Sequence, residues 1–279
     1  MRIKKYQIIW LIFLNVLLNV ICTRNIVEES IRNRLEINIV TSPLYREQNV
    51  GNEMVSFART VANPGKYIGI YLLESKFGYQ KWNNHFDTEI FLNLEDDWKK
   101  NGNYKKYIET TKAIWNDVKY FPVARFTNNS SMTVSYVDTW MNERTYGGKR
   151  GHEGTDIMAS VNERGLYPIV SMTDGIVKKM GWLEKGGYRI GVQSPSGVYF
   201  YYAHLESYAN LKEGDEVHAG DILGYMGDSG YGPEGTIGQF AVHLHLGIYI
   251  YPENEEMSVN PYWILRYIEN RMVKCYTEK

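Results

Sequence analysis

The stretch from Val242 to Tyr249 limits the possible folds most, because it places two histidines two residues apart within an apolar run. Branched aliphatic residues dominate this run, which is typical of a buried or half-buried strand. Side chains two residues apart in a strand leave on the same face. We therefore expect His243 and His245 to point together, opposite to Leu244 and Leu246. A bound cation would satisfy such a pair of imidazoles; two solvated surface histidines are the alternative.

Length and composition indicate a folded protein with one sizeable domain and a smaller one. The chain has 279 residues, of which 44% are apolar and 23% are charged, so it fits neither a disordered chain nor a membrane-embedded bundle. A formal net charge of −1 argues against a nucleic-acid partner held by bulk charge. The two cysteines, Cys22 and Cys275, form no C-x-x-C pattern. Any metal site must therefore use histidines and carboxylates.

Residues 1–22 have the form of an export signal, because basic side chains within residues 2–5 precede an apolar run from Ile8 to Cys22. The run is shorter than the ~20 residues that a spanning helix prefers, which favours a cleaved signal peptide. No Ala-x-Ala-like site follows it, which favours an uncleaved anchor. Both interpretations place the rest of the chain outside the cell membrane, either tethered by its N-terminal segment or secreted.

Residues 26–125 are predicted to form a small helical accessory region. Apolar residues recur there at helical spacing, and Asn63-Pro64-Gly65 ends the first such segment. The segments are 54–62, 66–77 and 104–120. The carboxylates of Glu74, Asp87 and Glu89 could be read as those of a glycosidase. Solvated helix faces explain them more simply.

After a polar turn at residues 127–131, short apolar runs alternate with Gly, Pro and Asp turns. This pattern predicts an antiparallel β-sandwich or barrel-like domain over residues 132–252. Residues 260–279 are expected to form a C-terminal helix and tail, with Pro261 in the first turn. The predicted class is therefore α+β, with a helical region before the β-rich domain. The expected strands are 132–137, 168–172, 175–180, 188–193, 198–202, 222–226 and 241–250.

Histidines and a carboxylate recur within this β-rich half. His152 and Asp156 stand four residues apart, His204 ends an expected strand, and His243 and His245 complete the set. A helix would place the first two on one face, but the surrounding glycines favour a loop that leads into a strand. A catalytic zinc site has three nitrogen or oxygen ligands and one open position. Two histidines and one carboxylate meet that count and leave two histidines to move protons.

These motifs together resemble the LytM/lysostaphin-type zinc metallopeptidases, which cut peptidoglycan peptides. The resemblance covers residues 147–249, and Gly247 and the glycine-rich loop 228–240 depart from the family pattern. The matching motifs are His152-x-x-x-Asp156, the Asp174-Gly175 turn, Tyr202-Ala203-His204-Leu205, the run from Leu211 to Gly220 with Gly224 and Gly227, and His243-Leu244-His245. Because the length and flexibility of this loop affect the shape of the groove, the resemblance implies no particular substrate preference.

The resemblance implies that His152, Asp156 and His245 hold Zn²⁺, while His204 and His243 are catalytic. It implies an exported zinc-dependent endopeptidase that hydrolyses peptide bonds in peptidoglycan stem peptides or cross-bridges, at the cell membrane or in the cell wall. The alternative from another class is a membrane-tethered scaffold of the same fold that binds peptidoglycan without cutting it. All five site positions are filled, which favours the enzyme.

Strand alternation predicts which tyrosine before His204 contacts the substrate. Tyr202 lies two residues from His204 and is expected to share its face, whereas Tyr201 is expected in the core. The remaining histidines, His85 and His218, are expected at the surface without a role.

Overall fold

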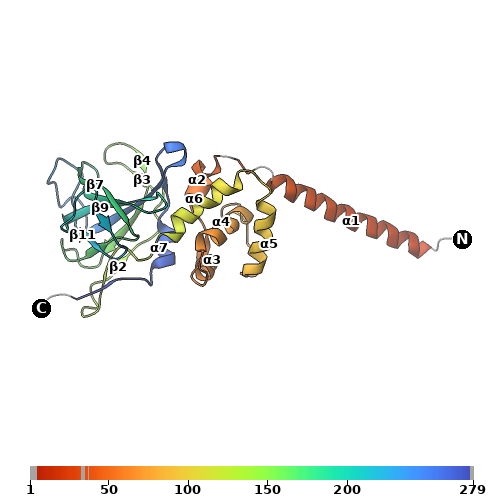
Figure 1. Cartoon of the computed structure of the whole chain (residues 1–279), viewed down its shortest axis with the longest axis horizontal. Coiled ribbons are helices and arrows are strands. Elements are labelled where there is room, and N and C mark those ends of the chain that lie inside the picture. Colours follow the sequence, from red (N-terminus) through yellow and green to blue (C-terminus); the bar gives the residue numbers. More distant parts are fainter. Residues whose placement is uncertain (1–4, 33–34, 37, 277–279) are drawn as a thin grey trace.

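The computed structural model describes residues 5–32, 35–36 and 38–276. Helix α1 (Lys5–Arg32) extends away from the rest of the molecule (Figure 1). Its part from Tyr6 to Ile26 is 21 residues long, with mean hydropathy 1.9 and none of its window buried inside the protein. By length and composition it could cross a membrane. It is longer than the apolar run recognised in the sequence, because the flanking residues are helical too.

A group of helices follows α1 and forms the expected helical region. Its members are α2 (Pro43–Arg46), α3 (Gly51–Ala58), α4 (Pro64–Glu74), α5 (Thr88–Trp98) and α6 (Tyr104–Asn116). The turn expected to end one helix also starts the next, because the Asn63 side chain accepts a hydrogen bond from the Lys66 N–H at 3.4 Å and caps α4. The three predicted helical segments are thus confirmed, with shifted ends.

The C-terminal half contains a ten-stranded sheet in which every strand pair is antiparallel. Its main path runs β10-β7-β8-β9-β12-β5-β2, and β11, β6 and β13 pair beside it. The strands are β2 (Val134–Ser135), β5 (Thr155–Ala159), β6 (Pro168–Val170), β7 (Gly175–Leu183), β8 (Gly187–Gln193), β9 (Tyr199–Tyr208), β10 (Glu216–Val217), β11 (Ile222–Met226), β12 (His243–Ile250) and β13 (Met257–Val259). The α+β class is confirmed, and the strands in the described residues do not close into a barrel.

Two short strand pairs complete the fold. Strands β3 (Glu143–Arg144) and β4 (Arg150–Gly151) form a hairpin before β5. Strand β1 (Arg125–Phe126) pairs in parallel with β14 (Lys274–Cys275), so the end of the chain lies beside the start of the β-rich half. The two-residue β1 begins at the last position of the segment expected to be helical, residues 26–125, whose last helix ends at Asn116.

The helical region packs on the β-rich domain, and one hydrophobic cluster includes residues of both. Helix α7 (Tyr262–Ile268) lies between them, with the ring of Tyr267 5.9 Å from that of Trp115 in α6. Arg46 of α2 donates to the Ser258 carbonyl at 2.7 Å and to Glu153 Oε1 at 2.8 Å. Glu153 follows His152 directly, so the helical region is bonded to the segment that carries the first candidate ligand.

Candidate metal centre and groove

Strand β12 lies between β9 and β5, and its histidines share one face as predicted. His243 and His245 line a groove, whereas Leu244 and Leu246 are fully buried on the opposite face. The register with β5 places His245 opposite Asp156. Pairing between strands distant in the sequence therefore brings the carboxylate to the histidines.

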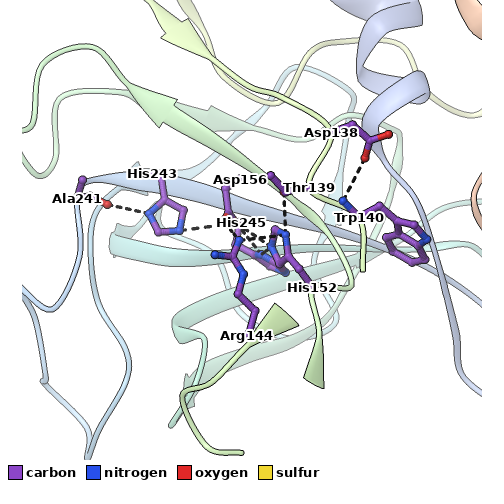
Figure 2. A network of polar contacts seen from close by, with 9 residues as sticks. All are labelled: Asp138, Thr139, Trp140, Arg144, His152, Asp156, Ala241, His243 and His245. Carbon is purple, nitrogen blue, oxygen red and sulfur yellow. Dashed lines mark hydrogen bonds and ion pairs between the residues drawn. The ribbon is translucent and has the colours of Figure 1, made fainter. Parts of the chain in front are cut away.

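Three side-chain atoms meet at equal distances at this point (Figure 2). Each edge of the triangle formed by His152 Nε2, Asp156 Oδ1 and His245 Nδ1 measures 3.0 Å. Ligands bound to one tetrahedral zinc at about 2.0–2.1 Å lie roughly 3.3 Å apart. The triangle therefore needs only a slight expansion to hold such an ion, and two imidazoles with one carboxylate are donors that suit zinc.

His152 reaches the triangle from a loop, as the glycines around it predicted. It follows β4 and precedes β5, where Asp156 stands. Gly154 between them makes this approach possible, because a Cβ atom there would lie 2.5 Å from Cε1 of His245 and 2.6 Å from the Leu246 carbonyl oxygen. Any side chain at this position would push against a candidate ligand.

Two residues that the sequence did not single out support the candidate ligands. Thr139 Oγ1 lies 2.9 Å from His152 Nδ1, and Arg144 Nη2 donates to Asp156 Oδ2 at 2.6 Å. When Nε2 of His152 binds a metal ion, the neutral ring carries its proton on Nδ1 and can donate it to Thr139 Oγ1. Burial raises the pKa of Asp156, but hydrogen bonds from His152 and His245 outweigh it and hold that pKa well below its usual range.

His204 and His243 are held in matching tautomers at the edge of the triangle. The Nδ1 atom of His204 lies 2.7 Å from the Ser229 carbonyl oxygen, and that of His243 lies 2.7 Å from the Ala241 carbonyl oxygen. A carbonyl only accepts, so each Nδ1 carries a proton and each Nε2 is left as the acceptor. The two rings are 4.8 Å apart and both line the groove. Burial and the neighbouring His243 lower the pKa of His204 well below its usual value, which favours its neutral form.

The expectation for Tyr202 was wrong. Its side chain is fully buried, and its hydroxyl accepts a hydrogen bond from the Met172 N–H at 2.9 Å. Tyr201 lines the groove instead, with its ring 6.1 Å from that of His245. The cause is a bulge in β9: its register with β8 shifts just before Leu205, and His204 has a φ of +64°. One extra residue reverses the alternation on which the prediction rested.

The remaining acidic residues and histidines of the sequence have structural or surface positions. Glu74 accepts a hydrogen bond from the Trp98 indole N–H at 2.8 Å. Asp87 caps α5 by accepting from the Glu89 N–H at 2.7 Å. Glu74 and Asp87 thus have structural roles, and Glu89 is exposed, as expected of a solvated helix face. His85 and His218 are exposed, as expected.

The groove beside the triangle has a volume of about 360 Å³. Beyond the five candidate site residues, its lining is mainly basic and aromatic, with one acidic residue, Glu256. The basic residues are Arg144, Arg150, Lys185 and Arg189, and the tyrosines are Tyr199, Tyr201, Tyr231 and Tyr249.

Two family models match the sequence: the LytM N-terminal domain over residues 30–117 and peptidase family M23 over residues 150–261. An L-Ala–D-Glu endopeptidase of Bacillus subtilis (strain 168) is 45% identical over 133 residues, which cover 47% of this chain and 40% of that protein. The glycyl-glycine endopeptidase ALE-1 of Staphylococcus capitis is 35% identical over 96 residues, covering 34% of this chain and 23% of that protein. The chain thus spans less than half the length of these curated relatives.

A solved structure resembles nearly the whole molecule. It is a crystal structure from Ruminococcus gnavus ATCC 29149, of a protein provisionally named a glycyl-glycine endopeptidase, lytM. It shares 52% sequence identity with a TM-score of 0.82, and the match covers 86% of this chain and 96% of that one. The similarity therefore extends beyond the β-rich domain to most of the helical region.

Proposed function

Since this chain belongs to the M23 family of peptidases, we propose that it is an exported zinc-dependent endopeptidase that hydrolyses peptide bonds of peptidoglycan. The observation that carries the proposal is the equal-sided triangle of His152 Nε2, Asp156 Oδ1 and His245 Nδ1. We assign these three residues as the zinc ligands. Among the relatives, one is named for an L-Ala–D-Glu bond and another for a glycyl-glycine bond, and we propose a bond of one of these classes as the substrate.

When bound by these ligands, Zn²⁺ supplies Lewis-acid activation of a water molecule and of the scissile carbonyl. The chain itself moves the protons. His204 and His243 present unprotonated Nε2 atoms to the groove, because backbone carbonyls hold their Nδ1 protons. One of these Nε2 atoms takes a proton from the attacking water, and the proton then passes to the leaving amine as the C–N bond breaks.

Two residues behind the candidate ligands hold them in their positions. Thr139 fixes the ring of His152, and Arg144 binds the second oxygen of Asp156, which leaves Oδ1 for the metal. The backbone of His204 lies in the left-handed region, which is unfavourable for a residue with a side chain. The bulge that creates this conformation turns the imidazole toward the groove, which supports its assignment as a catalytic residue.

Helix α1 supports the export part of the proposal. Its apolar part is long enough to cross a bilayer and is not covered by the rest of the protein. We propose that it directs the chain outward and either anchors it at the cell membrane or is removed to release it into the cell wall. Detection of the intact N-terminus in a washed membrane fraction would identify the anchored form.

A zinc measurement combined with muropeptide analysis tests the proposal. The purified full chain should contain one zinc and should release peptide fragments from peptidoglycan, identified by mass spectrometry. His245→Ala should lose both the zinc and the activity. His204→Ala should keep the zinc and lose activity by about 10²–10⁴-fold. The exposed His218 provides the control, and His218→Ala should retain both properties.

Two outcomes would contradict the proposal in different ways. Equal loss of zinc in His245→Ala and His204→Ala would overturn the division into ligands and catalytic residues. Zinc-loaded protein that binds peptidoglycan and leaves all its peptide bonds intact would support the scaffold function instead.

A further inference from the structure

The part of the groove that lies beyond the candidate zinc ligands is lined by tyrosines and arginines; we call it the second half of the groove. Tyr201 and Tyr249 form its wall nearest the triangle, with their rings 6.2 Å apart and that of Tyr201 6.1 Å from His245. Tyr199 continues the wall, 6.2 Å from Tyr249. Arg150 and Arg189 line the same groove from β4 and β8.

The two arginines have no acidic partner, unlike several other arginines of the molecule. Within residues 5–32, 35–36 and 38–276, neither guanidinium group makes a hydrogen bond or an ion pair, and the buried atoms Arg150 Nε and Arg189 Nη1 are unsatisfied. Other arginines are paired with carboxylates: Arg46 with Glu153, Arg59 with Glu269, Arg144 with Asp156 and Arg266 with Glu269. Leaving a buried donor unpaired costs free energy, and an anionic ligand would recover it.

Glycines keep this half of the groove open against its tyrosines. A Cβ atom on Gly247 would lie 2.7 Å from Cε2 of Tyr249, and one on Gly191 would overlap the ring of Tyr199. The register places Gly191 opposite Tyr201 and also places Gly247 opposite Tyr201, so small residues flank that tyrosine on both sides. This half of the groove therefore has room for a peptide next to the arginines.

The positive charges of the two arginines affect the tyrosines of this half of the groove. Burial raises the pKa of the Tyr201 hydroxyl, and the positive charges of Arg189 and Arg150 oppose that rise. Besides the candidate ligand Asp156, the acidic residue that lines the groove is Glu256. It is exposed, and its carboxylate accepts a hydrogen bond from the Tyr251 hydroxyl at 3.1 Å. It forms no ion pair with either arginine, so the inner part of this half is positively charged.

We propose that Arg150 and Arg189 form a binding site for a free carboxylate that the substrate peptide carries beside the scissile bond. A guanidinium group binds a carboxylate through two parallel hydrogen bonds, and the tyrosine walls exclude water from them. The enzyme then prefers a bond next to a residue such as glutamate with a free carboxylate over an uncharged glycine chain. This inference rests on the proposed endopeptidase function and specifies its substrate class.

Three matched substrates test the inference with the zinc-loaded full chain. The first is an acetylated L-Ala-γ-D-Glu-L-Lys peptide with the glutamyl α-carboxylate free, the second is the same peptide with that carboxylate amidated, and the third is pentaglycine. We expect kcat/KM to be about ten-fold or more higher for the free carboxylate than for the amide. Arg189→Gln should remove most of that difference by slowing the acidic substrate much more than the amidated one.

Arg150→Gln is the second variant and should reduce the preference in the same direction. Arg125 is an exposed arginine of β1, away from the groove, and Arg125→Gln should leave the ratio unchanged. The zinc content of each variant should equal that of the wild type, and measuring it checks that the metal centre is retained. Equal rates of the wild type on the free and amidated peptides, or a preference for pentaglycine, would overturn the inference while the endopeptidase function stands. Failure to cleave any of the three peptides or intact peptidoglycan would instead overturn the proposed function.

Discussion

Tyr201 and His204 line the same groove although they stand three positions apart along one strand. Regular alternation would place them on opposite faces. The bulge before Leu205 adds one residue to β9 and reverses the alternation of side chains between the two faces. As a result, Tyr201 faces the groove and Tyr202 faces the core. The two neighbouring tyrosines should consequently respond to mutation in opposite ways.

Tyr202→Phe should affect stability more than activity. It leaves the buried Met172 N–H without its acceptor, which costs about 1–3 kcal/mol of unfolding free energy. Tyr201→Ala should lower kcat/KM by about ten-fold through loss of a groove wall. Urea unfolding and peptide hydrolysis measured on both variants check this pair. A loss of activity confined to Tyr202→Phe would show that the bulge does not set the facing of these side chains.

Thr139→Val should weaken zinc binding without removing a ligand. The valine cannot accept the His152 Nδ1 proton, so the imidazole loses its fixed tautomer and orientation. Loss of such an outer contact typically reduces metal affinity about 10–100-fold. Competition with a chelator of known affinity measures the change. Thr110→Val on the exposed face of α6 is the matched control, and equal affinities in the two variants would contradict the role of Thr139.

Gly154→Ala should displace a zinc ligand. The added methyl group would lie 2.5 Å from the His245 ring and 2.6 Å from the Leu246 carbonyl oxygen, so the ring or the strand must move. We expect most of the bound zinc to be lost and the unfolding free energy to fall by about 1–3 kcal/mol. Gly102→Ala is the control, because a methyl group there meets no atom within 4 Å. Normal zinc content in Gly154→Ala would disprove this packing argument.

Stability should fall in acid partly because of Glu95, which bridges α4 and α5. Its carboxylate lies 2.8 Å from Lys66 Nζ and 3.3 Å from Lys99 Nζ. Burial raises its pKa, but the two lysines outweigh burial and lower it below the usual 4.5. A carboxyl whose pKa is lower in the folded state stabilises the protein above the unfolded pKa, and this contribution disappears as the pH falls through the folded pKa.

Glu95→Gln should therefore reduce the unfolding free energy at pH 7 by about 1 kcal/mol. The difference from the wild type should shrink as the pH falls below the usual carboxyl pKa of 4.5. Tryptophan fluorescence during urea unfolding at several pH values measures it. Asp96→Asn changes a carboxylate that is 74% exposed and should have little effect at any pH. A difference between Glu95→Gln and the wild type that persists unchanged at pH 3 would exclude the ion pairs as its source.

The facing of the β12 histidines and the loop that carries His152 could be predicted because they depend on local rules. The choice of His152, Asp156 and His245 as ligands came from the family resemblance, because the meeting of Asp156 with His245 depends on the pairing of distant strands. The period of two in β12 fixes the facing of His243 and His245, and the glycines before Asp156 indicate a loop that leads into a strand. The bulge in β9 has no such signal: His204 adopts the left-handed conformation without a glycine or asparagine to mark it. Thr139 could not be predicted either, because its contact with His152 depends on how a loop lies over the sheet.

The C-terminal tail belongs to both halves of the molecule, although the M23 match ends at residue 261. Helix α7 buries Ile264, Leu265 and Ile268, and the segment after it pairs with β1. A truncated chain that stops where the peptidase match stops would expose apolar surface on the helical region and free one edge of the β-rich half at once. Such a protein would tend to aggregate, and its low yield would say nothing about its chemistry.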